Sequence, residues 1–465
     1  MMNRVPRACV GGLGVSMAAA ALVALLLSVE RPAQAHAVGG ATAMDFPNES
    51  GLLRTIHTRG AFDLANPFFQ SLGTNGRACV NCHEPENAWS TTPAHIQQHF
   101  DVDGGASDPL FRPVDGANCP DMDVSTEEAR RTAYSLLLTK GLIRFSRPVS
   151  PDAEFEVIDI DDPYACSTPE ELSIYRRPLP ATNLKFLSEI MWDGREHSLQ
   201  TQALAAHATH AEGAGPLTAK VLAQIIKLET STFTAQQKDS TAAGLRTEGA
   251  NGGPAALSQE DFYFGINDPA PGLNPTGAPF DPNAFTLFTS WLQIDPATRN
   301  RRDRARLSIA RGEELFNTFP IRIFGVPGVN DPSEPGGIAP FVNGTCTTCH
   351  NTPNVGNRSF PASQNIGVTE ESRRPADVPL FTLANKQTGE IVRTTDPGRA
   401  LVTGLWKDIS RFKVPALRGL SARAPFFHDG SAATLAAVID FYETRFRLGL
   451  LPQQKLDLEA FLRSL

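Results

Sequence analysis

The sequence predicts a mainly α fold with two domains and long irregular insertions. Apolar residues recur at helical spacing in several segments, whereas strand-like character is visible only in FEVIDI (155–160). Pro and Gly make up about 16% of the 465 residues, which indicates many loops. A CxxCH motif occurs twice, with starts 267 residues apart, so we expect one domain around each copy. The predicted helical segments are 66–83, 126–140, 199–208, 217–229, 304–320 and 434–446.

The first 35 residues are typical of a cleavable signal peptide. Arg4 and Arg7 precede an apolar run, and the AQA sequence that ends at Ala35 has the small-x-small pattern of a cleavage site. An uncleaved membrane anchor is the alternative, but the apolar run is short for a membrane span. We therefore expect a protein that is exported to the periplasm.

The charge of the chain is concentrated in one segment. The formal net charge is −8, and residues 101–175 alone carry a net charge of −10. We interpret 101–175 as an acidic, Pro-rich insertion in the first domain. The rest of the chain is close to neutral, and nothing in it indicates a nucleic-acid-binding surface.

The seven cysteines fall into clear groups. Cys9 belongs to the signal peptide, and four others belong to the CxxCH motifs, which leaves Cys119 and Cys166. In an oxidising compartment these two most simply form a disulfide, which would contribute about 3–4 kcal/mol if unstrained. Two free thiols are the alternative.

Both CxxCH motifs have the spacing that attaches a c-type haem covalently. Two thiols reach the two vinyl groups, and the adjacent histidine binds the iron. A single copy could also be a redox dithiol or part of a zinc site, but two copies in an exported chain favour two covalently bound haem c groups. The haem-binding residues are then Cys79, Cys82 and His83 in the first copy and Cys346, Cys349 and His350 in the second.

The two motifs divide the chain into an N-terminal haem domain at 36–300 and a C-terminal haem domain at 301–465. The first is long for a minimal cytochrome fold because it contains the acidic insertion and a Gly- and Pro-rich stretch at 235–290. A further loop is expected at 324–344, just before the second motif.

The second haem lacks the usual methionine ligand, since no methionine follows Met191. If its distal ligand comes from its own domain, the candidates are His428, Tyr442, a lysine or water. The segment 433–446 predicts a helix that Thr434 caps. One face of that helix, which should pack on the haem, contains Leu435, Val438, Ile439, Tyr442 and Phe446.

Four blocks in order resemble the bacterial di-haem cytochrome c peroxidase and MauG superfamily. They are the first CxxCH, MWDGREHSLQTQAL (191–204), the second CxxCH, and the segment 412–442, which contains HDG. Together they cover about a third of the mature chain. The resemblance implies two cytochrome c-like domains, in which the N-terminal haem reacts with peroxide and the C-terminal haem stores and relays electrons.

The resemblance also implies roles for residues near the WDGR block. Trp192 would lie between the haems, and an ungapped count places the distal-pocket glutamine and glutamate at Gln202 and Glu212. A carboxylate in a haem pocket can move the proton that peroxide cleavage requires. The count puts Ala206 where the family commonly has a pocket proline, and His207 and His210 are alternative acid–base groups.

The two iron sites differ between subfamilies. In the cytochrome c peroxidases a histidine after the first CxxCH blocks the peroxide site until the partner haem is reduced, and His95 and His99 are the candidates here. In MauG-like members this face is open, and we favour an open site. The peroxidases use a methionine on the helix after HDG, whereas MauG-like members use a tyrosine, which matches Tyr442 and implies the tyrosine-ligated branch. His428 is the histidine of HDG.

Family members bind calcium between the haems through an asparagine side chain and two backbone carbonyls, which would fall at Arg423 and Pro425. No asparagine stands at the matching place near 176–183, and Asn183 is offset, so calcium stays a candidate cofactor only. The resemblance also suggests a homodimer, for which the residues give no independent signal.

These expectations describe an exported di-haem peroxidase that reduces H₂O₂ to water. Its electrons would come from a small periplasmic donor, either a cytochrome c or a cupredoxin, or from an oxidisable protein substrate. One alternative is a MauG-type oxidase that modifies residues of another protein. The other is a non-enzymatic di-haem electron-transfer cytochrome with two six-coordinate haems.

Overall fold

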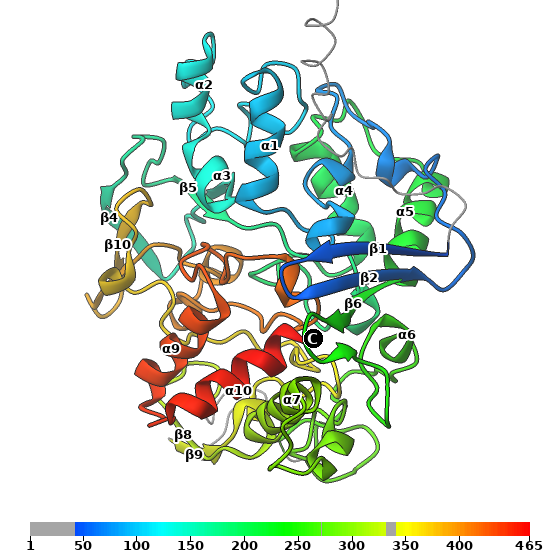
Figure 1. Ribbon diagram of the computed structural model, residues 1–465. Helices are drawn as coiled ribbons and strands as arrows, with labels where there is room; N and C mark the ends of the chain where they lie inside the picture. The colour runs from blue at the N-terminus through cyan, green and yellow to red at the C-terminus, as the bar shows by residue number, and fades with distance from the viewer. Residues whose placement is uncertain (1–41, 271, 332–340) are drawn as a thin grey trace, which may run out of the picture. The chain divides into compact units, whose positions relative to one another are not determined.

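The computed structural model describes residues 42–270, 272–331 and 341–465 (Figure 1). The signal peptide predicted over 1–35 lies outside these residues. Within them, no helix combines the length and apolar character that crossing a bilayer requires. The loop predicted at 324–344 begins and ends in short paired strands, and its central residues 332–340 also lie outside the described part of the chain.

Each predicted helical segment except the first overlaps one or two α-helices. Threonine or serine side chains cap the N-termini of several of them; Thr434, for example, accepts a hydrogen bond from the backbone of Ala437. The helices are α1 (Pro93–Asp103), α2 (Glu127–Ala133), α3 (Ser135–Lys140), α4 (Leu199–Thr209), α5 (Ala219–Ser231), α6 (Pro254–Leu257), α7 (Arg301–Thr318), α8 (Ala400–Thr403), α9 (Leu435–Phe446) and α10 (Pro452–Arg463). Of these, α1, α6, α8 and α10 were not predicted.

The predicted helix over 66–83 is wrong. The segment contains two short 3₁₀ turns, Pro67–Phe69 and Cys79–Asn81, joined by irregular chain. Gly73 and Gly76 interrupt it, and Gly76 has a φ of +83°, which an α-helix does not accommodate. The apolar spacing of these residues reflects contacts of a compact loop rather than one face of a helix.

Four small sheets make the fold less helical than we predicted. Their strand orders are β1-β2-β6-β7, β11-β10-β4, β3-β5 and β8-β9. The prediction of a mainly α fold therefore holds only in part. The strands are β1 (Ala43–Asn48), β2 (Gly51–His57), β3 (Ile143–Pro148), β4 (Phe155–Asp161), β5 (Glu171–Arg176), β6 (Thr232–Asp239), β7 (Ala243–Gly244), β8 (Ile321–Phe324), β9 (Phe341–Gly344), β10 (Leu380–Asn385) and β11 (Ile391–Thr394).

The acidic insertion 101–175 is folded onto both halves of the chain. It contains α2, α3, β3 and β4 and most of β5, and a disulfide joins Cys119 to Cys166, as predicted. Its strand β4 pairs with β10, more than 200 residues further along the chain. The two predicted domains thus share a sheet, and their boundary at residue 300 stays a prediction.

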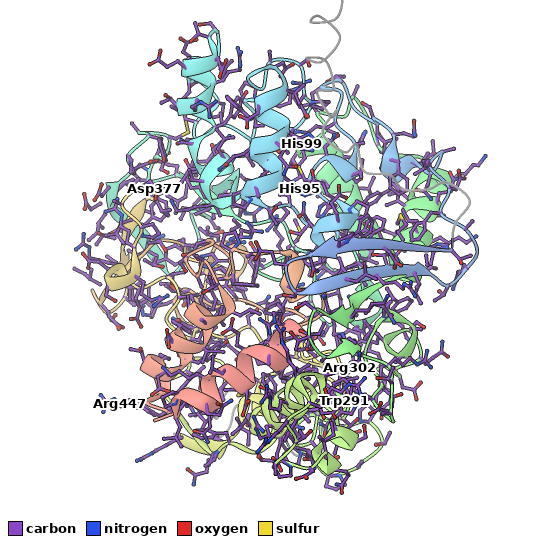
Figure 2. All side chains as sticks on the ribbon, viewed as in Figure 1. His95, His99, Trp291, Arg302, Asp377 and Arg447 are labelled. Atoms are coloured by element: carbon purple, nitrogen blue, oxygen red, sulfur yellow. A yellow bond between two sulfur atoms is a disulfide. The ribbon has the colours of Figure 1, made fainter. Side chains whose placement is uncertain are left out.

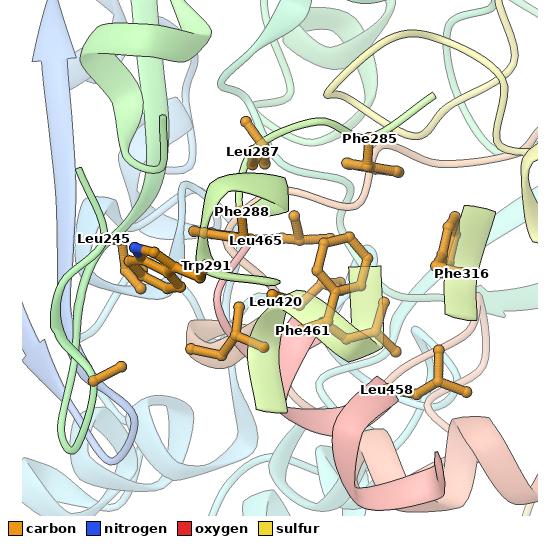
Figure 3. Packing of buried hydrophobic residues seen from close by; sticks show 14 of the residues in the cluster. Leu245, Phe285, Leu287, Phe288, Trp291, Phe316, Leu420, Leu458, Phe461 and Leu465 are labelled. Atoms are coloured by element: carbon orange, nitrogen blue, oxygen red, sulfur yellow. The ribbon is translucent and has the colours of Figure 1, made fainter. Parts of the chain in front are cut away.

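The largest buried cluster lies where α7 packs against α10 (Figures 1 and 3). Gly312 lets the two helices approach closely, because a Cβ atom there would lie 1.9 Å from the backbone oxygen of Asp457. The aromatic side chains in this cluster are Phe285, Phe288, Trp291, Phe316 and Phe461, and Phe316 also contacts the ring of His350 at 5.8 Å. This core therefore supports the second CxxCH motif directly.

Candidate functional site

Two cavities of about 230 Å³ each lie beside the two CxxCH motifs. We call the one that contains His83 cavity 1 and the one that contains His350 cavity 2. Both motif cysteines and the motif histidine line each cavity, together with mostly apolar side chains. A flat apolar ring that is attached through two thioethers requires this combination of groups.

A tight turn places the first motif on the wall of cavity 1. Residues Cys79–Asn81 form a 3₁₀ turn, and Asn81 accepts a hydrogen bond of 2.7 Å from the backbone of Ala78. The Nδ1 atom of His83 lies 3.1 Å from the backbone oxygen of Trp89, which leaves Nε2 as the nitrogen that an iron would bind. Burial lowers the pKa of His83 to about 4, so the imidazole is neutral and has a lone pair to offer.

The second motif is built in the same way. Thr345 caps the 3₁₀ turn Cys346–Thr348, and the Nδ1 atom of His350 lies 2.5 Å from the backbone oxygen of Gly356. Burial lowers the pKa of His350 to about 4 as well. In both motifs the Nδ1 atom of the histidine therefore contacts a backbone carbonyl oxygen, and this contact fixes the orientation of the imidazole ring.

The four motif cysteines are not joined in disulfides. Their apolar surroundings raise the pKa of Cys79, Cys82 and Cys346 to about 12, and that of Cys349 is raised too. In the metal-free protein such thiols are protonated at neutral pH. The apolar surroundings of the cysteines suit the apolar ring of a covalently attached haem c.

Helix α9 presents the predicted face to cavity 2. All five of its predicted residues, Leu435, Val438, Ile439, Tyr442 and Phe446, line that cavity with His350. Burial raises the pKa of the Tyr442 phenol. A phenol in such surroundings ionises only beside a strong positive charge, such as a ferric ion.

His428 also lines cavity 2 and is only 2% exposed. Its ring stacks on Phe412 with centroids 4.4 Å apart, and its Nδ1 atom has no hydrogen-bond partner among the described residues. It therefore stays an alternative to Tyr442 as a ligand in this cavity. The stacking on Phe412 also explains a purely structural role for the HDG histidine.

Trp192 lies in the wall that separates the two cavities, because it lines both. Its indole Nε1 donates a hydrogen bond of 2.9 Å to the backbone oxygen of Arg177, and its ring meets His428 edge-to-face at 6.3 Å. The other residues that line both cavities are Arg177, Pro178, Leu179, Lys413, Pro415 and Arg423.

The shared wall contains cations whose hydrogen bonds go to backbone carbonyls. Lys413 donates to the backbone oxygen of Glu189, and Arg423 donates to that of Ala416. Burial lowers the pKa of Lys413 to about 8 and that of Arg423 to about 10. Because buried charges are costly unless they are paired, this wall suits an anionic group, and a haem contributes two propionates.

Three of the four side chains predicted to surround the peroxide site lie around cavity 1. Gln202, His207 and His210 of α4 and its C-terminal end line it, together with Ala206. Glu212 does not: its side chain is exposed, and it is not among the described residues of the cavity wall. Helix α4 ends at Thr209, and the chain turns at Glu212 with a φ of +51°, so Glu212 is not on the helix that carries Gln202 and His207.

His210 is held by Asp115 of the acidic insertion, which forms an ion pair with Arg77. Its Nδ1 atom lies 2.5 Å from Oδ2 of Asp115, whose other oxygen pairs with Arg77. Asp115 is 4% exposed, and the Arg77 guanidinium and His210 hold its pKa below the usual value against the effect of burial. His207 differs, because its Nε2 atom lies 3.0 Å from the backbone oxygen of Leu72.

Glu229 on α5 is a site residue that the sequence did not reveal. It lines cavity 1, is 6% exposed, and has one carboxyl oxygen without a hydrogen-bond partner among the described residues. Burial alone raises the pKa of Glu229 to about 8. The only sequence signal was a carboxylate next to Ile225 and Leu228 on the apolar face of a helix.

His95 and His99 of α1 are engaged elsewhere (Figure 2). His99 lies 3.0 Å from a carboxyl oxygen of Glu84 and 2.7 Å from one of Asp108, and His95 lies 3.3 Å from Glu84. Neither histidine is among the described residues that line cavity 1. These ion pairs hold α1 against the first motif, with both rings outside the described lining of cavity 1.

Two of the candidate calcium ligands have hydrogen-bond partners within the protein. The Arg423 carbonyl accepts a hydrogen bond from Arg177, and the Asn183 amide is bonded to the backbone of Thr234. Across the described ranges, no group of three or more His, Cys, Asp and Glu side chains is placed to hold a metal ion. Calcium binding stays a prediction.

The sequence is similar to those of bacterial cytochrome c peroxidases. It is 32% identical over 173 residues to the cytochrome c551 peroxidase of Nitrosomonas europaea, which covers 35% of this chain and 44% of that protein. It is 26% identical over 285 residues to the cytochrome c peroxidase Ccp of Escherichia coli K12, which covers 61% of this chain and 46% of that protein. The chain thus spans less than half the length of these two relatives.

No protein-family model matches the sequence. Among solved structures, a MauG-like protein associated with microbial copper homeostasis covers 86% of this chain and 85% of its own, with 15% identity and a TM-score of 0.39. The similarity to the cytochrome c peroxidases confirms the family relationship predicted from the sequence blocks. The tyrosine-ligated branch stays a prediction.

Proposed function

We propose that this relative of the bacterial cytochrome c peroxidases is an exported di-haem peroxidase that reduces H₂O₂ to water at cavity 1. The observation that carries the proposal is the pairing of two haem-type cavities across a single tryptophan, Trp192. An isolated electron carrier needs one such cavity. The two cavities differ in the residues that line them together with the motif histidine. One cavity can therefore bind a small molecule while the other supplies the second electron of a two-electron reaction.

Each cavity would hold one haem c. His83 and His350 would bind the two irons, and the four motif cysteines would form the thioethers. The haem supplies the redox chemistry, and the protein orients the ring and controls access to it. The cations of the shared wall, above all Lys413 and Arg423, would neutralise the propionates.

Proton movement in cavity 1 would fall to His210. Reduction of H₂O₂ to two waters takes up two electrons and two protons, and a base must carry a proton from one peroxide oxygen to the other. The Asp115 carboxylate accepts the Nδ1–H of His210, so Nε2 presents its lone pair as the base. Gln202 lines the same cavity and can donate a hydrogen bond to a bound oxygen.

Cavity 2 would take the role of electron sharing. Tyr442 lies on the α9 face that lines the cavity with His350, so we propose it as the second iron ligand there. A phenolate stabilises the ferric state and higher oxidation states relative to the ferrous state. Such a site is a poor store for a preloaded electron but can accept an oxidising equivalent across Trp192.

The first cavity would remain open on its distal side. His95 and His99, the candidates for a blocking ligand, are held in ion pairs with Glu84 and Asp108. Peroxide could then react without prior reduction of the partner haem. This is the behaviour that a tyrosine-ligated second haem requires, since that haem resists reduction.

The electrons would return one at a time from a small periplasmic cytochrome c or cupredoxin, or from an oxidisable protein substrate. A MauG-type oxidase that modifies one partner protein shares all of these site features and is the second candidate. A homodimer is compatible with either reaction. An inert electron-transfer cytochrome would need both irons six-coordinate, and neither His95 nor His99 is among the described residues that line cavity 1.

One experiment separates these candidates. The purified holoprotein is mixed with H₂O₂ and a reduced cytochrome c or cupredoxin, and both peroxide consumption and donor oxidation are followed. Turnover at two donor electrons per peroxide supports the peroxidase. Oxidation of side chains in one partner protein without donor turnover supports the modifying oxidase, and no reaction with H₂O₂ at all excludes both.

A further inference from the structure

The guanidinium of Arg177 is bound by three backbone carbonyls that come from three separate parts of the chain. Nη2 lies 2.6 Å from the oxygen of Thr91 and 3.2 Å from that of Arg423, and Nη1 lies 2.8 Å from that of Lys140. Arg177 is 5% exposed and lines both cavities. A set of convergent carbonyl oxygens around one buried positive charge is the arrangement that proteins otherwise use for a hard cation.

Gly141 leaves room for this guanidinium. A Cβ atom at Gly141, which has a φ of +65°, would lie 2.5 Å from Nη1 of Arg177. Glycine is therefore needed both for the backbone conformation and for the approach of the side chain. The site is built for the arginine rather than left open for an ion.

A calcium ion would not fit beside it. The Arg423 carbonyl is one of the two that the family resemblance assigns to calcium, and here it accepts from Arg177. Asn183, the nearest asparagine, is bonded to Thr234 at 2.9 and 3.0 Å. All three partners of the guanidinium are neutral backbone carbonyls, and Arg177 already places a positive charge among them, so a divalent ion there would add charge next to Arg177 and Arg423.

The backbone of the same residue holds the wall between the cavities. The Arg177 carbonyl accepts the indole hydrogen bond of Trp192, and its N–H donates to the backbone oxygen of His428 at 2.7 Å. The position of Arg177 therefore sets the positions of Trp192 and of the HDG segment together.

We infer that Arg177 is a built-in cation that replaces the calcium ion of related di-haem proteins and fixes Trp192 between the two cavities. The protein is then calcium-independent. This inference rests on the proposed function only in that it concerns the wall between the same two cavities. The three hydrogen bonds from Arg177 to backbone carbonyls do not depend on the proposed function.

The test uses the wild-type holoprotein, treated with EGTA and freed of chelator by gel filtration. Titration with CaCl₂ in a calorimeter should show no binding, and EGTA should change neither the haem spectrum nor the unfolding midpoint. Stoichiometric calcium binding, or a spectrum that EGTA alters, would overturn the inference.

A pair of variants tests the role of the guanidinium itself. Arg177→Gln leaves three buried carbonyls without their donor and should lower the unfolding midpoint by several degrees. The matched control is Arg306→Gln, since Arg306 is also buried and donates to one backbone carbonyl, that of Ala242, but lines neither cavity. A larger loss for Arg177→Gln supports the inference, and an equal or smaller loss contradicts it.

Failure of this inference and failure of the proposed function are distinguishable. The calcium titration and the unfolding measurements involve no peroxide. A protein that binds no calcium yet does not react with H₂O₂ would leave the role of Arg177 intact and exclude the peroxidase.

Discussion

The imidazole of His210 lies against the carboxylate of Asp115, with Nδ1 2.5 Å from Oδ2, at the wall of cavity 1. The aspartate belongs to the acidic insertion, and Arg77, two residues before Cys79, pairs with its other oxygen. The insertion therefore reaches the site where we place the chemistry and orients a base there.

His210→Gln should slow the reaction of the ferric holoprotein with H₂O₂ by about 10²- to 10⁴-fold, the usual contribution of a positioned acid–base group. Stopped-flow absorbance at the haem bands measures this rate. Glu212→Gln is the control, because Glu212 is exposed and should leave the rate unchanged. If Glu212→Gln is slow and His210→Gln is not, the ungapped family count was right and our assignment is wrong.

Tyr442→Met should change the ferric spectrum of the C-terminal haem and convert its signal to that of a His/Met site. Methionine lacks the negative charge of a phenolate, so the reduction potential of this haem should rise. Electron paramagnetic resonance and a redox titration measure the two effects. Phe446→Leu, on the same face of α9, is the control and should change neither; an unchanged low-spin signal in Tyr442→Met would refute the ligand assignment.

Trp192→Phe should slow the sharing of oxidising equivalents between the haems while leaving peroxide binding intact. The substitution removes the indole hydrogen bond to Arg177 and shortens the ring that reaches both cavities. Rapid mixing with one equivalent of H₂O₂ should show a normal first spectral change at the N-terminal haem and a delayed change at the C-terminal one. Simultaneous changes at both haems would show that Trp192 is not the route.

Glu229→Gln should make the protein more stable at alkaline pH. Burial raises the folded-state pKa of Glu229 from 4.5 to about 8, so its stabilising protonation is complete below pH 4.5 and is lost as the pH rises through 8. The amide stays neutral throughout, so the advantage of the variant should grow to a few kcal/mol between about pH 5 and pH 9.

Denaturant unfolding of the holoprotein at a series of pH values measures this difference. Glu314→Gln, an exposed position on α7, is the control and should show no pH-dependent gain. A constant difference between Glu229→Gln and the wild type at all pH values would mean that the carboxyl is not neutral in the folded protein.

The sequence predicted the parts of the site that depend on local patterns. The CxxCH spacing predicted residues that line both cavities, and the helical periodicity of 433–446 placed Tyr442 on the face that lines cavity 2. The Cys119–Cys166 pair followed from elimination in an exported chain. Each of these inferences uses residues that are close in sequence or few in number.

Other features depend on contacts between distant segments, which no local pattern reveals. Strand β4 pairs with β10, which lies more than 200 residues further along the chain, so the sequence predicted too few strands. His99 was a candidate blocking ligand, but Glu84 and Asp108 pair with it, and it is not among the described residues that line cavity 1. Nothing in the sequence singled out Arg177, because its partners Thr91, Lys140 and Arg423 come from three remote segments.

The most direct test of the whole account is electron paramagnetic resonance of the ferric holoprotein before and after one equivalent of H₂O₂. We expect the ferric protein to show one high-spin haem, bound by His83, and one low-spin haem, bound by His350 and Tyr442. After peroxide both signals should diminish, because the two haems share the two oxidising equivalents. Two low-spin haems that do not respond to H₂O₂ would contradict this account and identify the protein as an electron-transfer cytochrome.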